Sequence, residues 1–311
     1  MIPPSSPGPR PQEQVSRSQV LRCAASAELR GDSLTASAPP AERWLLIESH
    51  DPWPRQALDA LRSTGHNLAA EVARLCAGLR CRPALIRRYG RIDRTATRRW
   101  AMVDSRPGHE SIRWGDLPND EHLLNVLSGA DPGTPSTEPI YLVCTHGRHD
   151  ACCAIRGRPA AATLAATFPE HTWECSHVGG DRFAANLVLL PHSLFYGHVP
   201  AALAPDLAAQ YNKGLVVPAY YRGSGAVAPP AQAAQHFARQ AGLSLSVNAL
   251  RPVAVHQPAP THWQVHLDNE GKPVEVNVSA HLTTIDAALT CAATPPGQAR
   301  TFTLTIPIEL P

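Results

Sequence analysis

The stretch PIYLVCTHGRHDACC, residues 139–153, sets the pattern from which the fold can be predicted. Pro139–Val143 is short and apolar, which indicates a buried strand. Cys153–Phe168 is rich in alanine and stops before Pro169, so it predicts a helix. His171–Cys175 predicts the next strand. A strand, a loop with cysteine and histidine, a helix and a strand therefore follow one another.

The residues that come next complete an α/β unit. Gly179 and Gly180 predict a tight turn, because glycine adopts backbone conformations that other residues avoid. Phe183–Leu190 and Leu194–Val199 flank a Pro-His-Ser turn and predict a hairpin. A helix is expected at Pro200–Asn212. Strand, helix, strand, hairpin and helix is the order of a thioredoxin-like unit, which we expect for residues 138–225.

Towards the N-terminus, residues 18–137 repeat this order without the cysteine cluster, so we expect an α/β protein of tandem thioredoxin-like units. The first unit is degenerate and the second is ferredoxin-like. Residues 1–17 are rich in Pro and Ser and predict a disordered lead, and residues 226–311 predict a small C-terminal α+β extension. In the first unit we predict strands at Arg43–Glu48, Pro83–Tyr89, Arg99–Asp104 and Ser111–Leu117 and helices at Pro54–Leu79 and Asn119–Leu127. In the C-terminal extension we predict a helix at Pro229–Ala241 and strands at Leu243–Val255, His262–Leu267, Val274–His281 and Phe302–Ile308.

Composition and charge narrow the class of protein. The chain has 311 residues and a net charge of +2, and no block of Lys or Arg indicates a nucleic-acid or membrane partner. Apolar runs such as Ala184–Pro191 are far too short to cross a bilayer, and the N-terminus lacks the apolar core of a signal peptide. We therefore expect a cytoplasmic protein. Its eight cysteines are then expected to be reduced, and metal-binding or redox-active.

Cysteine, histidine and aspartate gather after the two strands of the second unit. Cys144 and Cys153 flank the first loop, and Cys175, His177 and Asp181 lie in the second. Because the two strands are expected to be neighbours, these side chains should meet at one edge of the sheet. Such soft and borderline ligands suit iron–sulfur or zinc, but no close C-x2-C pair of a zinc site is present. We expect His146 and His149 to lie outside the ligand set, and Cys23, Cys76, Cys81 and Cys291 to be structural.

Residues 139–225 closely resemble the sucrase/ferredoxin-like family through CTHGRHDACC (144–153), WECSHVGGDRFAANLVLLPHSLFYGHV (173–199) and YYRGS (220–224). Weaker matches are RCAASAELRGDSLTASAPPAERWLLIE (22–48) and the segment around Cys291. The resemblance implies a thioredoxin-like ferredoxin domain, and fungal relatives hold a [2Fe–2S] cluster with two Cys and two His. By position these ligands become Cys144, Cys153, His177 and residue 181. That residue is Asp181 here, so either Asp181 or Cys175 completes the site, or the cluster is weaker or absent.

The resulting hypothesis is a [2Fe–2S] electron carrier that works with an unidentified redox partner protein and converts no substrate of its own. One alternative is a thioredoxin-like thiol oxidoreductase that uses Cys152 and Cys153, because a helix N-terminus lowers the pKa of a thiol there. Against it, the usual C-x-x-C pair is missing. The other alternative is a structural zinc or interaction module.

Overall fold

The computed structural model describes residues 21–63, 65, 67–90 and 93–308. The predicted lead at residues 1–17 lies outside these described residues. The cysteine-rich half folds into β6 (Ile140–Cys144), α4 (Ala151–Thr167), β7 (Thr172–Cys175), β8 (Leu187–Leu190), β9 (Leu194–Tyr196), α5 (Ala204–Asn212) and β10 (Tyr221–Ser224).

The N-terminal half contributes α1 (Cys23–Arg30), β1 (Arg43–Glu48), α2 (Leu68–Gly78), β2 (Cys81–Arg88), β3 (Arg98–Asp104), β4 (Ser111–Leu117), α3 (Leu123–Ser128) and β5 (Thr134–Ser136). The C-terminal part contains α6 (Pro229–Gln240), β11 (Arg251–Ala259), β12 (His262–Asn269), β13 (Lys272–Ile285) and β14 (Gly297–Leu304). Short 3₁₀ turns are η1 (Ala57–Ala60), η2 (Asp120–His122), η3 (Asp181–Phe183), η4 (Ala201–Leu203) and η5 (Pro218–Tyr220).

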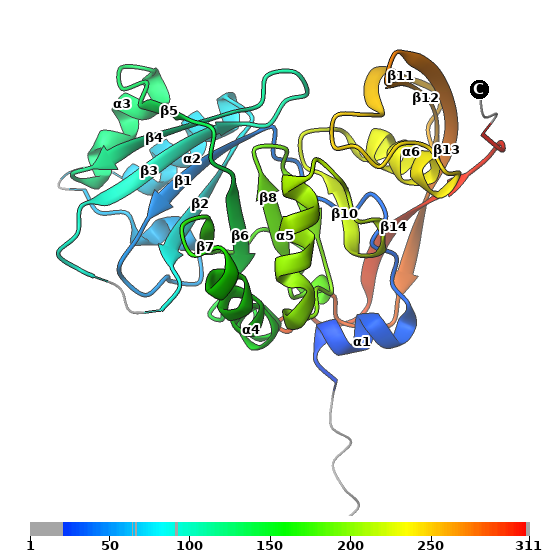
Figure 1. The fold of residues 1–311 in the computed structure, drawn as a ribbon. Helices are drawn as coiled ribbons and strands as arrows, with labels where there is room; N and C mark the ends of the chain where they lie inside the picture. Colours follow the sequence, from blue (N-terminus) through cyan, green and yellow to red (C-terminus); the bar gives the residue numbers. More distant parts are fainter. Residues whose placement is uncertain (1–20, 64, 66, 91–92, 309–311) are drawn as a thin grey trace, which may run out of the picture.

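Ten strands form one mixed sheet in the order β10-β9-β8-β6-β7-β2-β1-β3-β4-β5 (Figure 1). The α/β class is thus confirmed. The neighbours β2-β1-β3-β4 and β7-β6-β8-β9 repeat one pattern, in which the first pair is parallel and the next two pairs are antiparallel. Antiparallel pairing of β2 with β7 joins the halves, so that both predicted domains share one sheet. The thioredoxin-like assignment of each half stays a prediction.

Several of the predicted elements begin later than expected. In the predicted helix Pro54–Leu79, the α-helix starts only at Leu68, where the Asn67 side chain accepts a hydrogen bond from the Ala70 backbone N–H at 3.1 Å. The positive φ of Gly65, 156°, is incompatible with one continuous right-handed helix. The predicted strand at Leu243 begins only at Arg251, because the preceding residues make a loop that pairs with the rest of the chain through a single bridge, Leu215 with Ser246.

The hairpin prediction also needs a correction at its start. Phe183 belongs to the 3₁₀ turn η3, and β8 begins at Leu187. The turn is closed because Gly180 has a φ of 84° and its carbonyl accepts a hydrogen bond from Asn186 Nδ2 at 2.9 Å. Helix α1 was not expected, since residues 18–40 have little periodicity; it buries Cys23, Ala24 and Ala27.

The helices of the second half pack closely on its strands. In Figure 1, α4 and α5 lie in front of β6 and β8. Tyr141 and Val143 of β6 join a core cluster with both helices, whereas Leu142 and Cys144 join a separate cluster that contains Trp44 and Cys175. Gly157 permits the close approach of α4, because a Cβ there would overlap the carbonyl oxygen of Cys144. The start of α4 and the end of β6 are thereby held close together at the edge of the sheet where Cys144 lies.

The C-terminal residues form a separate antiparallel sheet in the order β11-β12-β13-β14. Alanines of α6, among them Ala234 and Ala238, pack on Val265 and Val276 of this sheet. The loop between β13 and β14 extends back towards α1 (Figure 1). Among the helices of the described residues, none combines the length and the apolar character that crossing a bilayer requires.

Candidate metal centres

The ends of β6 and β7 place two cysteines side by side. Cys144 is the last residue of β6 and Cys175 is the last residue of β7, and the parallel register sets them opposite each other. Both side chains are fully buried. Helix α4 begins directly above this edge, capped by Asp150, whose Oδ1 accepts a hydrogen bond from the Cys152 backbone N–H at 2.8 Å. The predicted meeting point of the two loops therefore exists in the fold.

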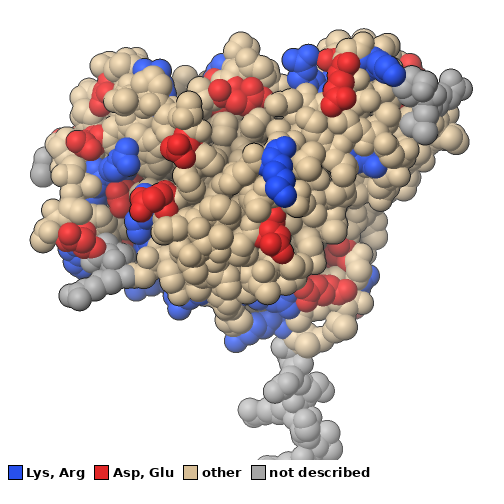
Figure 2. Space-filling model, viewed as in Figure 1, with Lys and Arg blue, Asp and Glu red and all other residues tan. Residues whose placement is uncertain are grey.

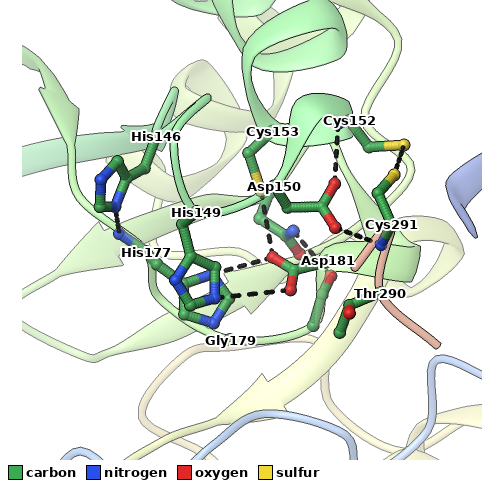
Figure 3. A network of polar contacts seen from close by, with 12 residues as sticks. His146, His149, Asp150, Cys152, Cys153, His177, Gly179, Asp181, Thr290 and Cys291 are labelled. Atoms are coloured by element: carbon green, nitrogen blue, oxygen red, sulfur yellow. Dashed lines mark hydrogen bonds and ion pairs between the residues drawn. The ribbon is translucent and has the colours of Figure 1, made fainter. Parts of the chain in front are cut away.

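Four of the predicted site residues come together, and Figure 3 shows three of them, Cys153, His177 and Asp181. Donor atoms of Cys144, Cys153 and His177 all lie within 4.8 Å of one another. Asp181 is buried beside them: its Oδ1 accepts a hydrogen bond from Cys153 Sγ at 3.2 Å and lies 2.9 Å from His177 Nδ1. We call Cys144, Cys153, His177 and Asp181 the first group. Cys175 contacts Cys144 but belongs to none of the donor sets that converge within 4.8 Å among the described residues.

His149, which the sequence predicts to lie outside the ligand set, also reaches this group. The His149 ring stacks on the His177 ring, with centroids 3.7 Å apart and planes 17° apart. Its Nε2 lies 3.7 Å from Asp181 Oδ2, and donor atoms of His149, His177 and Asp181 converge within 4.8 Å. His149 is therefore a further candidate ligand.

His146 has a supporting place instead. Its Nδ1 accepts a hydrogen bond from the His177 backbone N–H at 3.3 Å, and its Nε2 bonds the Pro54 carbonyl at 2.8 Å. These contacts hold the start of the second loop against the segment at Pro54.

The electrostatics of the first group favour a thiolate at Cys144. Hydrogen bonds from Cys153, Cys175 and His177 hold the pKa of Cys144 well below its usual value, although burial opposes them. Burial, followed by the contact with Cys144, raises the pKa of Cys175. Burial lowers the pKa of His177, but its hydrogen bonds to Asp181 and Cys144 outweigh burial and raise the pKa to about 9. Cys144 is thus the natural anionic ligand, and Cys175 is a donor to it.

A buried arginine holds the second loop in place. Arg222 Nη1 donates to the Gly179 carbonyl at 2.9 Å and to Asn186 Oδ1 at 2.7 Å, and Nη2 donates to the Ser37 carbonyl at 2.6 Å. Gly180 lies against the same guanidinium, where a Cβ would clash with it. Arg222 therefore shapes the turn that presents His177 and Asp181.

A second group of donors lies on the other side of the first turn of α4. Cys152 points away from Cys153, and its Sγ lies 3.6 Å from Cys23 Sγ and 3.4 Å from Cys291 Sγ. Asp150 accompanies them, and donor atoms of all four residues converge within 4.8 Å. We call Cys23, Asp150, Cys152 and Cys291 the second group. The spacing of these residues gave no signal for the second group, because its three segments are far apart along the chain.

Comparison with models of protein families identifies a relationship that covers most of the ten-stranded sheet. A model of the sucrase/ferredoxin-like family matches residues 34–223, which span both halves of the ten-stranded sheet. No curated protein and no solved structure matches the chain significantly. The family match covers more than half of the 311 residues and includes the whole first group, together with the glycine turn and Arg222. The chain therefore belongs to the sucrase/ferredoxin-like family.

Proposed function

We propose that the first group holds a [2Fe–2S] cluster and that the protein is an electron carrier. The observation that carries the proposal is the convergence of Cys144, Cys153, His177 and Asp181 at one buried edge of the sheet. The ligand types of the first group, two thiols, an imidazole and a carboxylate, are compatible with an iron–sulfur centre, because Cys is its usual ligand and His replaces Cys in some clusters. When bound, such a cluster supplies a one-electron redox centre.

The chain prepares these ligands in two ways. Hydrogen bonds keep Cys144 as a thiolate, so that no proton need leave it on binding. Cys175 stays protonated, because burial and the neighbouring thiolate raise its pKa, and it donates to Cys144. Hydrogen bonds to a ligating sulfur tune the potential of an iron–sulfur site. We therefore assign Cys175 to the support of Cys144 rather than to ligation.

A cavity beside the histidines of the first group offers a surface where electrons can enter or leave the cluster. The cavity is lined by His146, His149, Ser176 and His177, together with residues of η1 and α2 such as Leu58 and Ala70. His149 and His177 are about a quarter exposed, whereas Cys144 and Cys153 are buried. We propose that the redox partner protein docks over the two histidines, with the thiolates behind them.

Charge supports a protein partner over nucleic acid. The net charge is +2, and the face seen in Figure 2 has basic and acidic side chains interspersed, without a broad patch of one sign. A nucleic-acid site would need clustered Lys and Arg to neutralise phosphates.

The proposal is tested by metal and sulfide analysis. The full chain, purified anaerobically or reconstituted with iron and sulfide, is expected to contain about two irons and two acid-labile sulfides per chain. Chelation of the iron should bleach the visible absorption and leave the fold intact by circular dichroism. Iron without labile sulfide, or no iron after reconstitution, would contradict the [2Fe–2S] assignment.

The fourth ligand is expected to be Asp181, because it contacts both Cys153 and His177. Asp181→Ala should lose the cluster, whereas Asp181→His should keep it and raise its potential, because a neutral imidazole replaces a negative ligand. Visible spectra and redox titration of the reconstituted variants measure both effects.

Two matched variants test the competing ligands. Cys175→Ser and His149→Ala should leave the cluster spectrum close to that of the parent chain. If one of them loses the cluster while Asp181→Ala retains it, the fourth ligand is that residue and not Asp181.

The thiol oxidoreductase alternative is less favoured by the geometry. Cys153 Sγ faces Asp181, whereas Cys152 Sγ faces Cys23 and Cys291, so the two neighbours do not form a dithiol pair. A hydrogen bond from Cys23 lowers the pKa of Cys152 to about 6, against the effect of burial. This reactive character belongs to the second group and leaves the electron-carrier proposal as the better account of the first.

A further inference from the structure

The second group brings together three thiols that the chain holds far apart. Cys23 opens α1, Cys152 lies in the first turn of α4, and Cys291 lies in the loop between β13 and β14. Their sulfurs form a triangle with sides of 3.4, 3.5 and 3.6 Å. Cys23 and Cys152 are buried, and Cys291 is exposed at the rim. The function proposed for the first group uses none of these residues.

The size of the triangle distinguishes between a metal ion and a disulfide. A tetrahedral ion with metal–sulfur bonds of about 2.3 Å keeps its sulfurs about 3.8 Å apart. A disulfide would bring two sulfurs to about 2 Å and leave the third aside. All three sides of the observed triangle are similar and close to the first value. We propose that Cys23, Cys152 and Cys291 bind one thiophilic divalent cation, for which Zn²⁺ is the best fit.

Asp150 fixes two of the three ligands and faces the third. Its Oδ1 accepts the Cys152 backbone N–H at 2.8 Å, and its Oδ2 accepts the Cys291 backbone N–H at 2.6 Å. Both carboxylate oxygens lie 3.8 Å from Cys23 Sγ. The carboxylate is thus within reach of an ion held by the sulfurs, and it completes a Cys₃Asp donor set of the kind that suits zinc. A divalent cation also offsets the negative charge that thiolates and a carboxylate bring together.

The position of the site indicates what the ion does. The ion would connect α1 and the β13–β14 loop to the start of α4 through Cys152. The residue after Cys152 is Cys153, which belongs to the first group. Cys23 and Cys291 both lie outside residues 34–223, the segment that matches the family. A cavity beside Cys23 and Cys291, lined also by Arg22 and Thr290, gives the ion a path from solvent. The ion is therefore a clamp between the two ends of the described chain and its centre.

Co²⁺ binding to a full-length chain that cannot form the first site tests the proposal. In a Cys144→Ala/Cys153→Ala background, with folding checked by circular dichroism, Co²⁺ under reducing conditions should bind with one equivalent and give a strong sulfur-to-metal absorption band. Cys291→Ala should remove the band, and Zn²⁺ should displace Co²⁺. Cys76→Ala is the matched control, since Cys76 is a buried cysteine in the separate α2 cluster, and it should leave the band unchanged.

A second measurement uses the unaltered chain, so that the outcome does not depend on the background. Zn²⁺ should protect Cys291 from alkylation, as read by peptide mass spectrometry, and Asp150→Asn should weaken Zn²⁺ binding by about 10–100-fold. A band that survives in Cys291→Ala, unprotected Cys291, or a disulfide among the three cysteines under reducing conditions would overturn the proposal. Because the background of the Co²⁺ experiment lacks Cys144 and Cys153, the Co²⁺ results are independent of iron and sulfide at the first site.

Discussion

Cys144→Ser and Cys153→Ser are each expected to abolish retention of the [2Fe–2S] cluster. Both thiols are buried at the meeting point of β6, β7 and α4, where Cys144 contacts Cys153 and Cys175, and Cys153 contacts Asp181. A serine hydroxyl is a poor ligand for iron and lacks the soft character of thiolate. Each variant should lose the visible absorption of the reconstituted chain and most of its labile sulfide.

Cys76→Ser and Cys291→Ser serve as the controls for this prediction. Cys76 belongs to the core cluster around α2. Cys291 belongs to the second group, which is separated from the first group by the first turn of α4. Both variants should retain iron and sulfide. If either control loses the cluster while its circular dichroism is unchanged, or if Cys144→Ser keeps it, the ligand assignment fails.

Arg222→Met is expected to destabilise the fold more than any substitution of a surface arginine. The guanidinium is 1% exposed and bonds the carbonyls of Gly179 and Ser37 and the amide of Asn186. Burial, together with repulsion from Arg182 and Arg82, lowers the pKa of Arg222 to about 9, and attraction to Asp181 and Cys144 opposes this shift. Methionine fills similar space but leaves the buried acceptors without this donor, each at about 1–3 kcal/mol.

The expected loss is about 3–5 kcal/mol in the free energy of unfolding of the metal-free chain, measured by urea denaturation. Because Arg222 shapes the Gly179–Gly180 turn, the variant should also fail to retain the cluster. Arg251→Met is the matched control: its ion pair with Asp268 lies on the surface, where solvent screens it, and its loss should destabilise the fold far less than the loss of Arg222. Equal destabilisation by the two substitutions would contradict the structural role of Arg222.

The sequence alone determined the order of the elements in the cysteine-rich half and the core of the first group. Local patterns suffice there, because the periodicity of apolar residues indicates whether a segment is a helix or a strand and which of its faces is buried. Cys144 and Cys175 end neighbouring parallel strands, so their proximity follows from the order strand, helix, strand. His177 and Asp181 then follow on a short glycine turn. A chain with these elements has few other ways to place them.

The tertiary structure decided the rest. Pairing of β2 with β7 merges the two halves into one sheet, which no local pattern predicts because edge strands choose partners by packing. His149 reaches His177 through the path of a loop, and loops have no periodicity that fixes side-chain direction.

The second group shows most clearly that local sequence patterns cannot predict contacts between distant segments. Its three thiols belong to Cys23, Cys152 and Cys291. They are separated by 129, 139 and 268 residues along the chain in their three pairings, and they meet only because α1 and the β13–β14 loop both pack against the start of α4. Sequence spacing carries information about such a site only when its ligands share one segment. When each ligand arrives on a different element, the docking of those elements creates the site, and docking is set by the burial of apolar surface over the whole fold.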